Sequence, residues 1–587
     1  MSPKKRKQSA AGSPLMKNRY FLYATSFFSG MSVMAIELGA SRLLAPYFSS
    51  SMIVWTVIIG VIMIALALGN VIGGRLADKN PDPLRLYRRL LLAALWTAAI
   101  PFAGKYVIAG VSLGLAMVIK TNFLIWASFI SCFLVFVFPL ILLGTVSPSL
   151  IKYSVLNLRE NGKVVGELSA ISTIGSIIGT FLPTFVTIPT VGTAATFLIF
   201  AGILALISLI YFLSVKKYTI RNSLLLIIIL GFLFFPMDAS FAFWETNLLY
   251  EGESVYNYLQ VKDTPDSIIM STNVLEGIQS IMMKDDTQLT GLYFEYALAG
   301  PLIAGLPMKG DPVSGTGSGG ASTSGSGSTY STGADRTDTS STGNPGADRA
   351  DSRVLMLGLG TGTYATQVLR YFPEITFEGV EIDEKIVRLA EEFFRLPEDV
   401  VVSVNDGRAY LQDSGMYDVI LVDAYQDITI PFQMSSREFF TMVSDHLNEG
   451  AVMMVNLNMH SAKEGSINDY ICDTIASIYP YVYTMPTPRS TNAILLASYM
   501  PDMLERLQAR TDAIDAGSPL KRLMLEMLAG LQKREAGPLI LTDDKAPVEL
   551  LGMKVIDEII AGNLSYYQNV LEREGLGGLL RSMGLSG

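Results

Sequence analysis

The chain has 587 residues, half of them hydrophobic, a mean hydropathy of +0.38 and a formal net charge of −9. It is too apolar for an ordinary soluble protein, and the acidic balance without a basic aromatic stripe argues against nucleic acid as a partner. With two cysteines (Cys132, Cys472) and two histidines (His446, His460), a disulfide framework and a histidine-rich metal site are disfavoured. We therefore expect a membrane protein without a bound metal.

Residues 1–19 form a basic, polar tail that lacks the apolar core of a removable signal peptide. Residues 20–243 hold nearly all of the apolar excess and are predicted to be a transmembrane helical domain. A span needs about 20 apolar residues. Seven segments approach or exceed that length, with 106–119 expected to be an interfacial helix or an extra half-span: 20–46, 53–77, 89–109, 124–150, 166–189, 193–214 and 223–243.

Lysine and arginine cluster in the tail and in alternate loops, at 79–89, 152–163 and 216–221. The positive-inside rule makes the N-terminus and these loops cytoplasmic, and a seventh span then places the C-terminal half outside. The chemistry of the ligand predicted below favours the cytoplasm instead, so the sequence leaves the side open. Glu37, within the first span, is a candidate functional residue, with a structural pairing to another helix as the alternative.

Residues 245–309 change pattern and predict a small β subdomain. ESVYNYLQVKD, SIIMSTNVLEG and QSIMMKDDTQ alternate apolar and polar residues, as β-hairpins do, and TGLYFEYALAGPLIAG predicts a short helix. Residues 310–352 are rich in Gly, Ser and Thr without apolar periodicity. We expect this segment to be a disordered insertion in a surface loop.

Residues 353–500 begin with RVLMLGLGTGTYA, in which Gly358, Gly360 and Gly362 stand between an apolar strand and a helical pattern. A strand, a glycine turn and a helix N-terminus form a cradle for a nucleotide or nucleoside. Glu381 ends the second apolar strand about twenty residues later, where an acid is placed to hold ribose hydroxyls.

A third strand ends at Asp406-Gly407 and a fourth at Asp423. The carboxyl ends of parallel strands line one crevice, so these groups should meet there. The strand–helix alternation predicts a Rossmann-like, methyltransferase-type, mostly parallel sheet with helices on both faces and two final strands on one edge. Residues 501–587 are expected to be a C-terminal helical extension, with Asp543 and Asp544 capping the helix of APVELL.

This ordered set resembles the spermidine synthase (polyamine aminopropyltransferase) family, specifically the bacterial members whose catalytic domain follows a multi-span region. The resemblance covers about residues 250–500, with a looser likeness in the spans and in TDDKAPVE. It implies a transferase that moves an aminopropyl group from decarboxylated S-adenosylmethionine to a putrescine-like amine, without a metal. The lipid bilayer, and a second copy in a homodimer, are the further partners expected.

The resemblance also assigns roles residue by residue. Gly358, Gly360 and Gly362 match the family's glycine loop, Glu381 its ribose-binding acid, and Asp406, followed by Gly407, its adenine-contacting acid. Asp423 matches the acid that takes a proton from the attacking amine. Gln260 matches a donor-contacting position, and Tyr293 an amine-contacting one.

Three departures fall at the amine end of the implied site. Thr361 stands where the family usually has the Asp that holds the donor's amino group. The second Asp of the family signature is replaced, and Asp427 lies one residue late. Phe294 stands where the family often has Gln or His. The nucleoside end thus keeps the residues of the family pattern, whereas the amine end lacks several of them.

Three functions follow from these patterns. The leading hypothesis is a membrane-anchored aminopropyltransferase. The second is an S-adenosylmethionine-dependent methyltransferase, because the loss of the acid at Thr361 leaves room for a donor that keeps its carboxylate. The third is a non-catalytic module that binds a nucleoside or polyamine on a transporter-like bundle. Donor preference separates the first two, and Asp423→Asn separates catalysis from binding alone.

Overall fold

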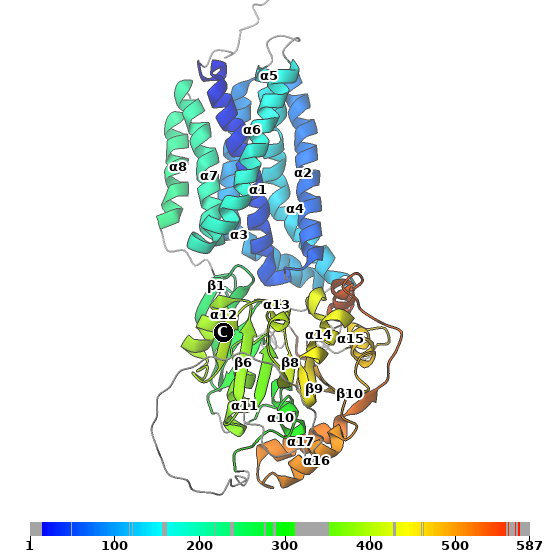
Figure 1. Cartoon of the computed structure of the whole chain (residues 1–587). Coiled ribbons are helices and arrows are strands. Elements are labelled where there is room, and N and C mark those ends of the chain that lie inside the picture. The colour runs from blue at the N-terminus through cyan, green and yellow to red at the C-terminus, as the bar shows by residue number, and fades with distance from the viewer. Residues whose placement is uncertain are drawn as a thin grey trace, which may run out of the picture.

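The computed structural model describes residues 14–48, 50–116, 118–119, 121–154, 161–216, 218–234, 240–274, 278–285, 289–310, 352–425, 430–458, 461, 463–558, 562, 570 and 573–575. A helical bundle stands on an α/β part that holds a small and a large β-sheet (Figure 1). The predicted insertion at 310–352 lies almost wholly outside the described residues.

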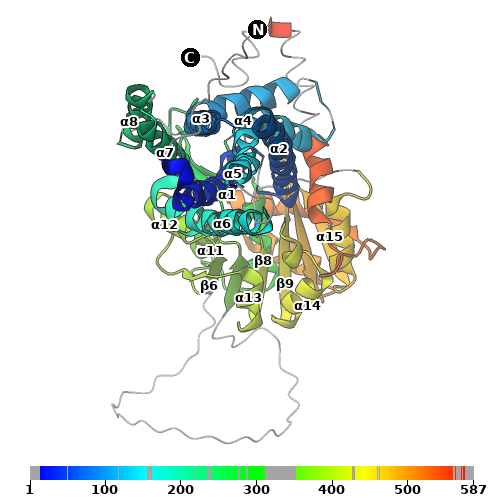
Figure 2. The ribbon, with the colours of Figure 1, turned by 90° about the horizontal axis from the view of Figure 1, so that it is seen from above.

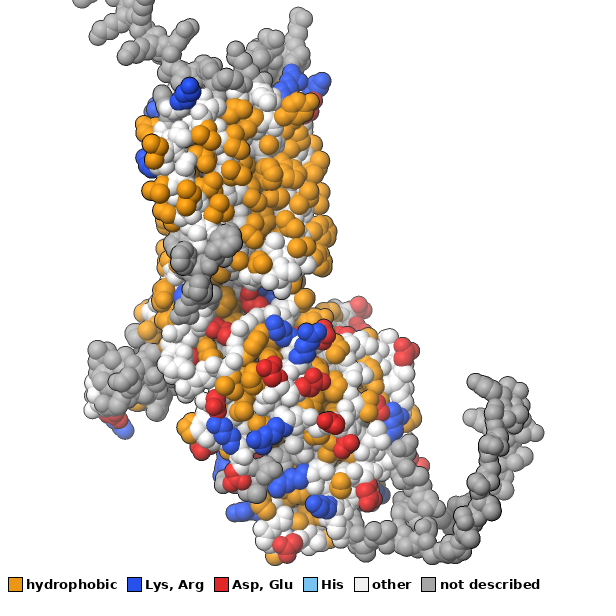
Figure 3. All heavy atoms as spheres, turned by 90° about the vertical axis from the view of Figure 1, so that its left-hand side faces the viewer, with side chains coloured by type: hydrophobic (Ala, Val, Ile, Leu, Met, Phe, Trp, Pro, Cys, Tyr) orange, Lys and Arg blue, Asp and Glu red, His pale blue; other side chains and the backbone are white. Residues whose placement is uncertain are grey.

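The bundle is built from apolar helices. Five helical stretches of the described residues are long and apolar enough to cross a membrane: 19–48, 52–79, 83–116, 123–154 and 162–214. Its elements are η1 (Pro14–Lys17), α1 (Arg19–Phe48), α2 (Met52–Lys79), α3 (Pro83–Ala116), α4 (Phe123–Gly144), α5 (Val146–Ser154), α6 (Asn161–Leu182), η3 (Pro183–Thr187), α7 (Ile188–Ser214) and α8 (Thr219–Phe234). Figure 3 shows apolar side chains covering the face of this bundle that is turned to the viewer.

The difference between these five stretches and the seven predicted spans has two causes. The segments 166–189 and 193–214 belong to one stretch, 162–214, which bends at Gly192 (φ 82°, ψ 170°). The segment 223–243 begins within α8, of which 16 residues are described, and its residues 235–239 lie outside the described residues. Figure 1 shows α6, α7 and α8 all running along the bundle, and Figure 2 shows α8 at its outer edge. The segment 106–119 is mostly the end of α3, not a separate helix.

Small residues explain how α1 and α6 pack closely. A Cβ atom added at Gly175 would lie 2.0 Å from the carbonyl oxygen of Phe27, and one at Gly179 would lie 2.1 Å from that of Met31. The same holds between α2 and α4, where a Cβ at Gly69 would lie 2.5 Å from a backbone oxygen of α4. Such close backbone contact at small residues is typical of helices that associate in lipid.

The small sheet follows the bundle. It is antiparallel, in the order β1 (Leu248–Glu253), β2 (Tyr258–Asp263), β3 (Ser267–Ser271) and β4 (Ser280–Met283), and is followed by α9 (Tyr293–Tyr296) and α10 (Ala299–Ile303). Its apolar face packs on α12 (Glu384–Phe393), with Leu259 and Val261 against Ile386 and Leu389. The small sheet therefore packs beside α12, the second of the helices that connect parallel strands of the large sheet.

The large sheet has eight strands, in the order β12-β10-β11-β9-β8-β5-β6-β7. The five strands from β9 to β7 are parallel, and β10, β11 and β12 add to β9 in antiparallel fashion. The strands are β5 (Arg353–Leu357), β6 (Thr376–Glu381), β7 (Val401–Val404), β8 (Tyr417–Val422), β9 (Leu447–Leu457), β10 (Tyr481–Pro486), β11 (Ala493–Ser498) and β12 (Gln532–Arg534). This confirms the predicted Rossmann-like fold class.

Helices cover both faces of this sheet because its strands are apolar on both sides. In β5, Met356 packs into one core layer, whereas Leu355 and Leu357 pack into the other. The remaining helices of this part are α11 (Thr363–Tyr371), α13 (Gly407–Gln412), α14 (Arg437–Asp445), α15 (Ile467–Ala476), α16 (Met503–Ala513) and α17 (Pro519–Gly530), with the 3₁₀ turn η4 (Phe432–Met434).

The segment after residue 500 is not a purely helical extension. It forms α16 and α17 and then β12, which pairs with β10 as the edge strand of the large sheet. The order of the parallel strands reverses at β5, because β6 and β7 follow on one side of it, whereas β8 and β9 lie on the other. Ligands of open α/β sheets bind at such a switch point, outside the carboxyl ends of the strands.

Candidate active site

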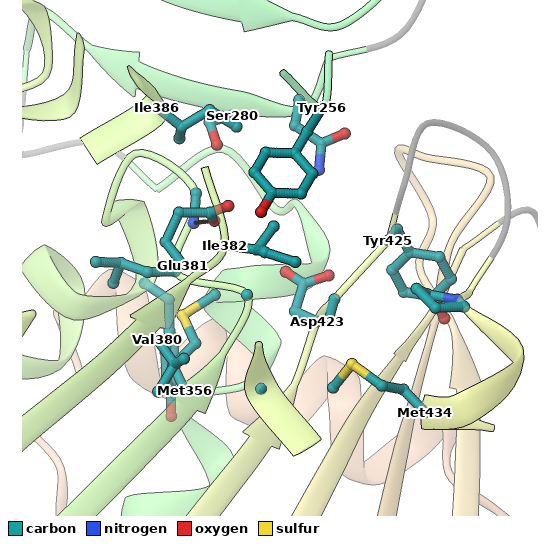
Figure 4. A pocket seen from close by; sticks show the side chains of 18 of the residues that line it. Tyr256, Ser280, Met356, Val380, Glu381, Ile382, Ile386, Asp423, Tyr425 and Met434 are labelled. Atoms are coloured by element: carbon teal, nitrogen blue, oxygen red, sulfur yellow. Dashed lines mark hydrogen bonds between the residues drawn. The ribbon is translucent and has the colours of Figure 1, made fainter. Parts of the chain in front are cut away.

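A cavity lies at the carboxyl ends of β5, β6, β7 and β8 (Figure 4). The small sheet closes it from the other side through Tyr256, Asn257, Thr272, Gln279 and Ser280. From the large sheet and the segments beside it, the lining includes Tyr293, Phe294, Gly358, Gly360, Glu381, Ile382, Asp406, Gly407, Asp423, Ala424, Tyr425 and Met434.

The glycine loop brings backbone to within contact of the end of β8. Gly358 has φ +90°, and a Cβ atom there would lie 2.4 Å from the carbonyl oxygen of Asp423. Only glycine fits a position that is both left-handed and in close contact with backbone. Gly362, at φ +78°, starts α11 but does not line the cavity; a Cβ there would lie 2.2 Å from Leu396. The loop thus holds Gly358 and Gly360 at the floor of the cavity.

Glu381, the last residue of β6, is buried beside this loop. Its Oε2 accepts a hydrogen bond from the backbone N–H of Gly360 (2.9 Å), and its Oε1 accepts one from the N–H of Asp383 (3.1 Å). Burial raises the pKa of Glu381 to about 7, although these backbone donors oppose the shift. Figure 4 shows the carboxylate at the cavity wall below Tyr256. Backbone donors thus fix both oxygens of this carboxylate at the edge of the cavity.

Asp423, just after β8, is the second buried acid. Tyr293 donates its hydroxyl to Oδ2 (2.8 Å), and Asn456 donates its amide to Oδ1 (2.7 Å). Burial raises the pKa of Asp423 to about 7 against the effect of both donors. A carboxylate with this pKa can accept a proton near neutral pH.

Asn456 was not predicted from the sequence. It ends β9 and is in turn held by Asn492, whose amide donates to its Oδ1 (2.8 Å). A polar residue closing an apolar strand (VMMVNL) was the available signal, but β9 becomes a neighbour of β8 only through the order of the sheet.

Asp406 and Gly407 stand at the end of β7. Asp406 caps α13, accepting a hydrogen bond from the N–H of Ala409 (2.9 Å), and both residues line the cavity. The next residue, Arg408, donates to both oxygens of Asp543 (2.8 and 2.7 Å). The predicted cap role of Asp543 is therefore wrong. Arg408 lowers the pKa of Asp543 to about 2, and this ion pair ties α13 to the TDDKAPVE segment.

Other predicted residues do not join the site or lie outside the described residues. Gln260 is buried in β2 away from the cavity, and its amide donates to the carbonyl of Asn273 (2.6 Å). Thr361 is buried too, and its backbone N–H donates a hydrogen bond to the hydroxyl of Ser280 (3.3 Å). Glu37 lies in α1 within the bundle. Asp427 lies outside the described residues.

The cavity combines acids with aromatic surface. Glu381, Asp406 and Asp423 contribute carboxylates, and no lysine or arginine occurs among the described residues that line it. Tyr256, Tyr293, Phe294 and Tyr425 supply aromatic faces. Acidic walls around an apolar slot suit a nucleoside that carries positive charge.

Comparison with known proteins agrees with this geometry. Residues 344–502 match the family model described as the spermine/spermidine synthase domain. The probable polyamine aminopropyl transferase of Bifidobacterium longum (strain NCC 2705) is 43% identical over 392 residues, which is 64% of this chain and 78% of the relative. The polyamine aminopropyltransferase of Vibrio vulnificus (strain CMCP6) is 26% identical over 212 residues, covering 34% of this chain and 69% of the relative.

Among solved structures, a probable spermidine synthase from Corynebacterium glutamicum ATCC 13032 is 18% identical, with a TM-score of 0.34. It covers 50% of this chain, and 98% of that chain is matched. The family assignment depends instead on the Bifidobacterium longum relative, because the alignment spans more than three quarters of that protein at 43% identity. The chain therefore belongs to the spermidine synthase (polyamine aminopropyltransferase) family, and it is a transferase.

Proposed function

We propose that this enzyme transfers the aminopropyl group of decarboxylated S-adenosylmethionine to a putrescine-like amine. The observation that carries the proposal is the buried carboxylate of Asp423, held by Tyr293 and Asn456 beside a glycine-lined cradle. Its raised pKa, about 7, makes it a proton acceptor at the pH at which the acceptor amine is otherwise protonated.

In this proposal the donor's adenosine lies across the ends of β5, β6 and β7. Glu381 accepts the ribose hydroxyls, and Asp406 contacts the adenine, with Gly358, Gly360 and Gly407 giving the backbone room to approach. The donor's sulfonium and amine are cationic, and the acidic walls of the cavity favour both charges.

The transfer then needs one proton movement and one exchange of bonds. Asp423 takes a proton from the acceptor's ammonium group, which frees the nitrogen lone pair. That nitrogen attacks the aminopropyl carbon next to the sulfonium, so a C–N bond forms as the C–S bond breaks. The electron pair of the C–S bond returns to sulfur, and neutral methylthioadenosine leaves.

We place the acceptor end of the cavity beside Asp423. Tyr293 lies there through its bond to Asp423, next to Phe294, which lines the wall without a polar group. We propose Tyr293, with Asp427 as a further acid, as the contacts of the amine. Few acids around aromatic side chains favour an acceptor with a single charged amine near the reaction centre.

The direct test gives the purified full-length protein decarboxylated S-adenosylmethionine and putrescine. We expect methylthioadenosine to be released in a one-to-one ratio with the aminopropylated amine, measured by liquid chromatography. Absence of nucleoside binding by calorimetry at millimolar donor would refute the proposal.

A second candidate, transfer of a methyl group from S-adenosylmethionine, is favoured by one observation. Thr361 replaces the acid expected to hold the donor's amino group, and its side chain is buried against Thr363 (3.3 Å) rather than in the cavity. Competition between the two donors in the same assay decides between them. Tighter binding of the carboxylated donor would support the methyltransferase.

We also propose that the bundle anchors the enzyme in a membrane with the N-terminus in the cytoplasm. The α/β part with its two sheets is here called the soluble part. Figure 3 shows lysine and arginine gathered at the end of the bundle farthest from it. The positive-inside rule makes that end cytoplasmic and so places the catalytic part on the other side, where donor and acceptor must then be supplied. We expect a reporter enzyme fused after Gly587 to be active outside the cytoplasm. Cytoplasmic activity would show that the charge pattern does not set the orientation.

The role of Asn456 gives a pH prediction. Its hydrogen bond lowers the pKa of Asp423, so Asn456→Ala should raise that pKa above about 7. Because only the ionised carboxylate accepts a proton, the acid limb of the kcat/KM profile should move to higher pH by roughly half a unit or more. The matched control is Asn448→Ala, which removes a 3.0 Å bond to Asp418 of β8, the strand that Asp423 directly follows. An unchanged acid limb in Asn456→Ala would contradict the assignment.

A further inference from the structure

The wall of the cavity includes the turn between β1 and β2, residues 254–257, here called the wall turn. Its Tyr256 and Asn257 line the cavity, and Figure 4 shows Tyr256 above Glu381 and Asp423. The turn is coupled to the nucleoside cradle through Asp383. Ser254 donates its hydroxyl, and Asn257 its amide (3.4 Å), to Oδ2 of Asp383. The N–H of Asp383 in turn donates to Glu381 (3.1 Å).

The helical bundle holds the wall turn from the other side. Arg42, near the end of α1, donates to the carbonyl oxygens of Ser254 (3.1 Å) and Val255 (2.7 Å). These two bonds join positions 212 and 213 residues apart in the sequence. A charged guanidinium that spans two successive carbonyls fixes both their direction and their separation.

A second bundle contact holds the strand that leads into the turn. Glu253, the last residue of β1, accepts hydrogen bonds from the hydroxyl of Thr193 (2.8 and 3.0 Å) and from its N–H (3.3 Å). Thr193 directly follows the bend at Gly192, where α7 turns away from the soluble part. Two helices of the bundle, α1 and α7, therefore form hydrogen bonds to residues 253–255.

Apolar packing alone does not hold the turn. Val255 is 63% exposed and Tyr256 is 38% exposed. A segment with little buried apolar surface opens easily unless hydrogen bonds restrain it. Restraint of the turn before binding spares the ligand the entropy of ordering it.

We propose that the bundle is part of the donor site, with Arg42 and Thr193 as positioning residues that fix the wall turn against the nucleoside cradle. This inference rests on the proposed function and adds a role for the bundle besides anchoring. It implies that any movement of α1 relative to the soluble part changes the affinity for the donor. The soluble part cut from the bundle should accordingly bind nucleoside more weakly than the full chain.

The test compares Arg42→Ala with Lys105→Ala in the full-length protein. Lys105 is a matched control because it also donates from the bundle to a backbone carbonyl, that of Ser240 (2.7 Å), which does not line the cavity. We expect Arg42→Ala to weaken methylthioadenosine binding about ten-fold by calorimetry, as befits the loss of charged hydrogen bonds. Lys105→Ala should stay within about two-fold, since it leaves the wall turn untouched.

Hydrogen exchange supplies a readout that needs no ligand. Amides of residues 253–257 should exchange faster in Arg42→Ala and in the isosteric Thr193→Val, but not in Lys105→Ala. Arg42→Lys, which keeps one charged donor, should recover part of the affinity. Equal exchange and equal binding in Arg42→Ala and Lys105→Ala would overturn the inference. If the wild type bound no nucleoside, the proposed function would fail, and exchange alone would still decide whether the bundle restrains the turn.

Discussion

Asp423→Asn should lower kcat by about 10²–10⁴-fold, the usual contribution of a general base, while methylthioadenosine binding changes little. The substitution keeps the size of the side chain, and its carbonyl oxygen still accepts one of the hydrogen bonds from Tyr293 and Asn456. It cannot, however, take the proton that the attacking ammonium must lose. The measurement is single-turnover release of methylthioadenosine, with calorimetry on the same samples.

Asp418→Asn is the matched control for this variant. Asp418 is a buried acid too, but it lies near the start of β8, where it accepts from the N–H of Arg353 (3.0 Å) and the amide of Asn448 (3.0 Å). Its replacement should reduce stability without a comparable loss of kcat. Equal kcat losses in the two variants would mean that Asp423 acts through folding rather than as a base.

The pH dependence has a definite sign. Burial raises the pKa of Asp423 to about 7, so the group gains a proton as the pH falls through 7. The protonated acid cannot act as a base, and the rate should therefore fall on the acid side. Glu381 titrates in the same range, with a pKa of about 7 that is also raised by burial. A steeper acid limb than one proton allows would show that both acids must be ionised.

The acids and glycines that line the cavity could be predicted to lie together because their determinants are local. The glycines stand directly after β5, and Glu381, Asp406 and Asp423 stand at or just after strand ends. Parallel strands bring such ends together whatever the rest of the chain does. The place of Gln260 outside the cavity lining could not be predicted, because an alternating strand pattern shows which residues share a face but not what that face meets.

Contacts between distant segments could not be predicted. Arg408 and Asp543 are 135 residues apart, and Arg42 reaches the wall turn across 212 residues. Neither pair has a local signal, because each depends on where whole elements pack. Hydropathy likewise measures the length of an apolar segment but does not reveal the bend at Gly192, where two predicted segments join in one helical stretch.

Gly358→Ala should cause the largest loss of donor binding of any single methyl addition to the site. The residue has φ +90°, which disfavours alanine, and the new Cβ would lie 2.4 Å from the carbonyl oxygen of Asp423. Relief of that clash must move the end of β8, and with it the proposed base. We expect a loss of about 1–3 kcal/mol of stability from the left-handed backbone alone, and loss of measurable methylthioadenosine binding.

Gly450→Ala separates backbone strain from the clash at the site. Gly450 has a similar φ of +77°, but the nearest atom to a Cβ there is the sulfur of Met500, at 3.7 Å. It lies near the start of β9, whereas Asn456 lies near the end of that strand. Both variants should lose stability in thermal denaturation, whereas only Gly358→Ala should lose nucleoside binding. Normal binding by a folded Gly358→Ala protein would show that the glycine loop does not position Asp423.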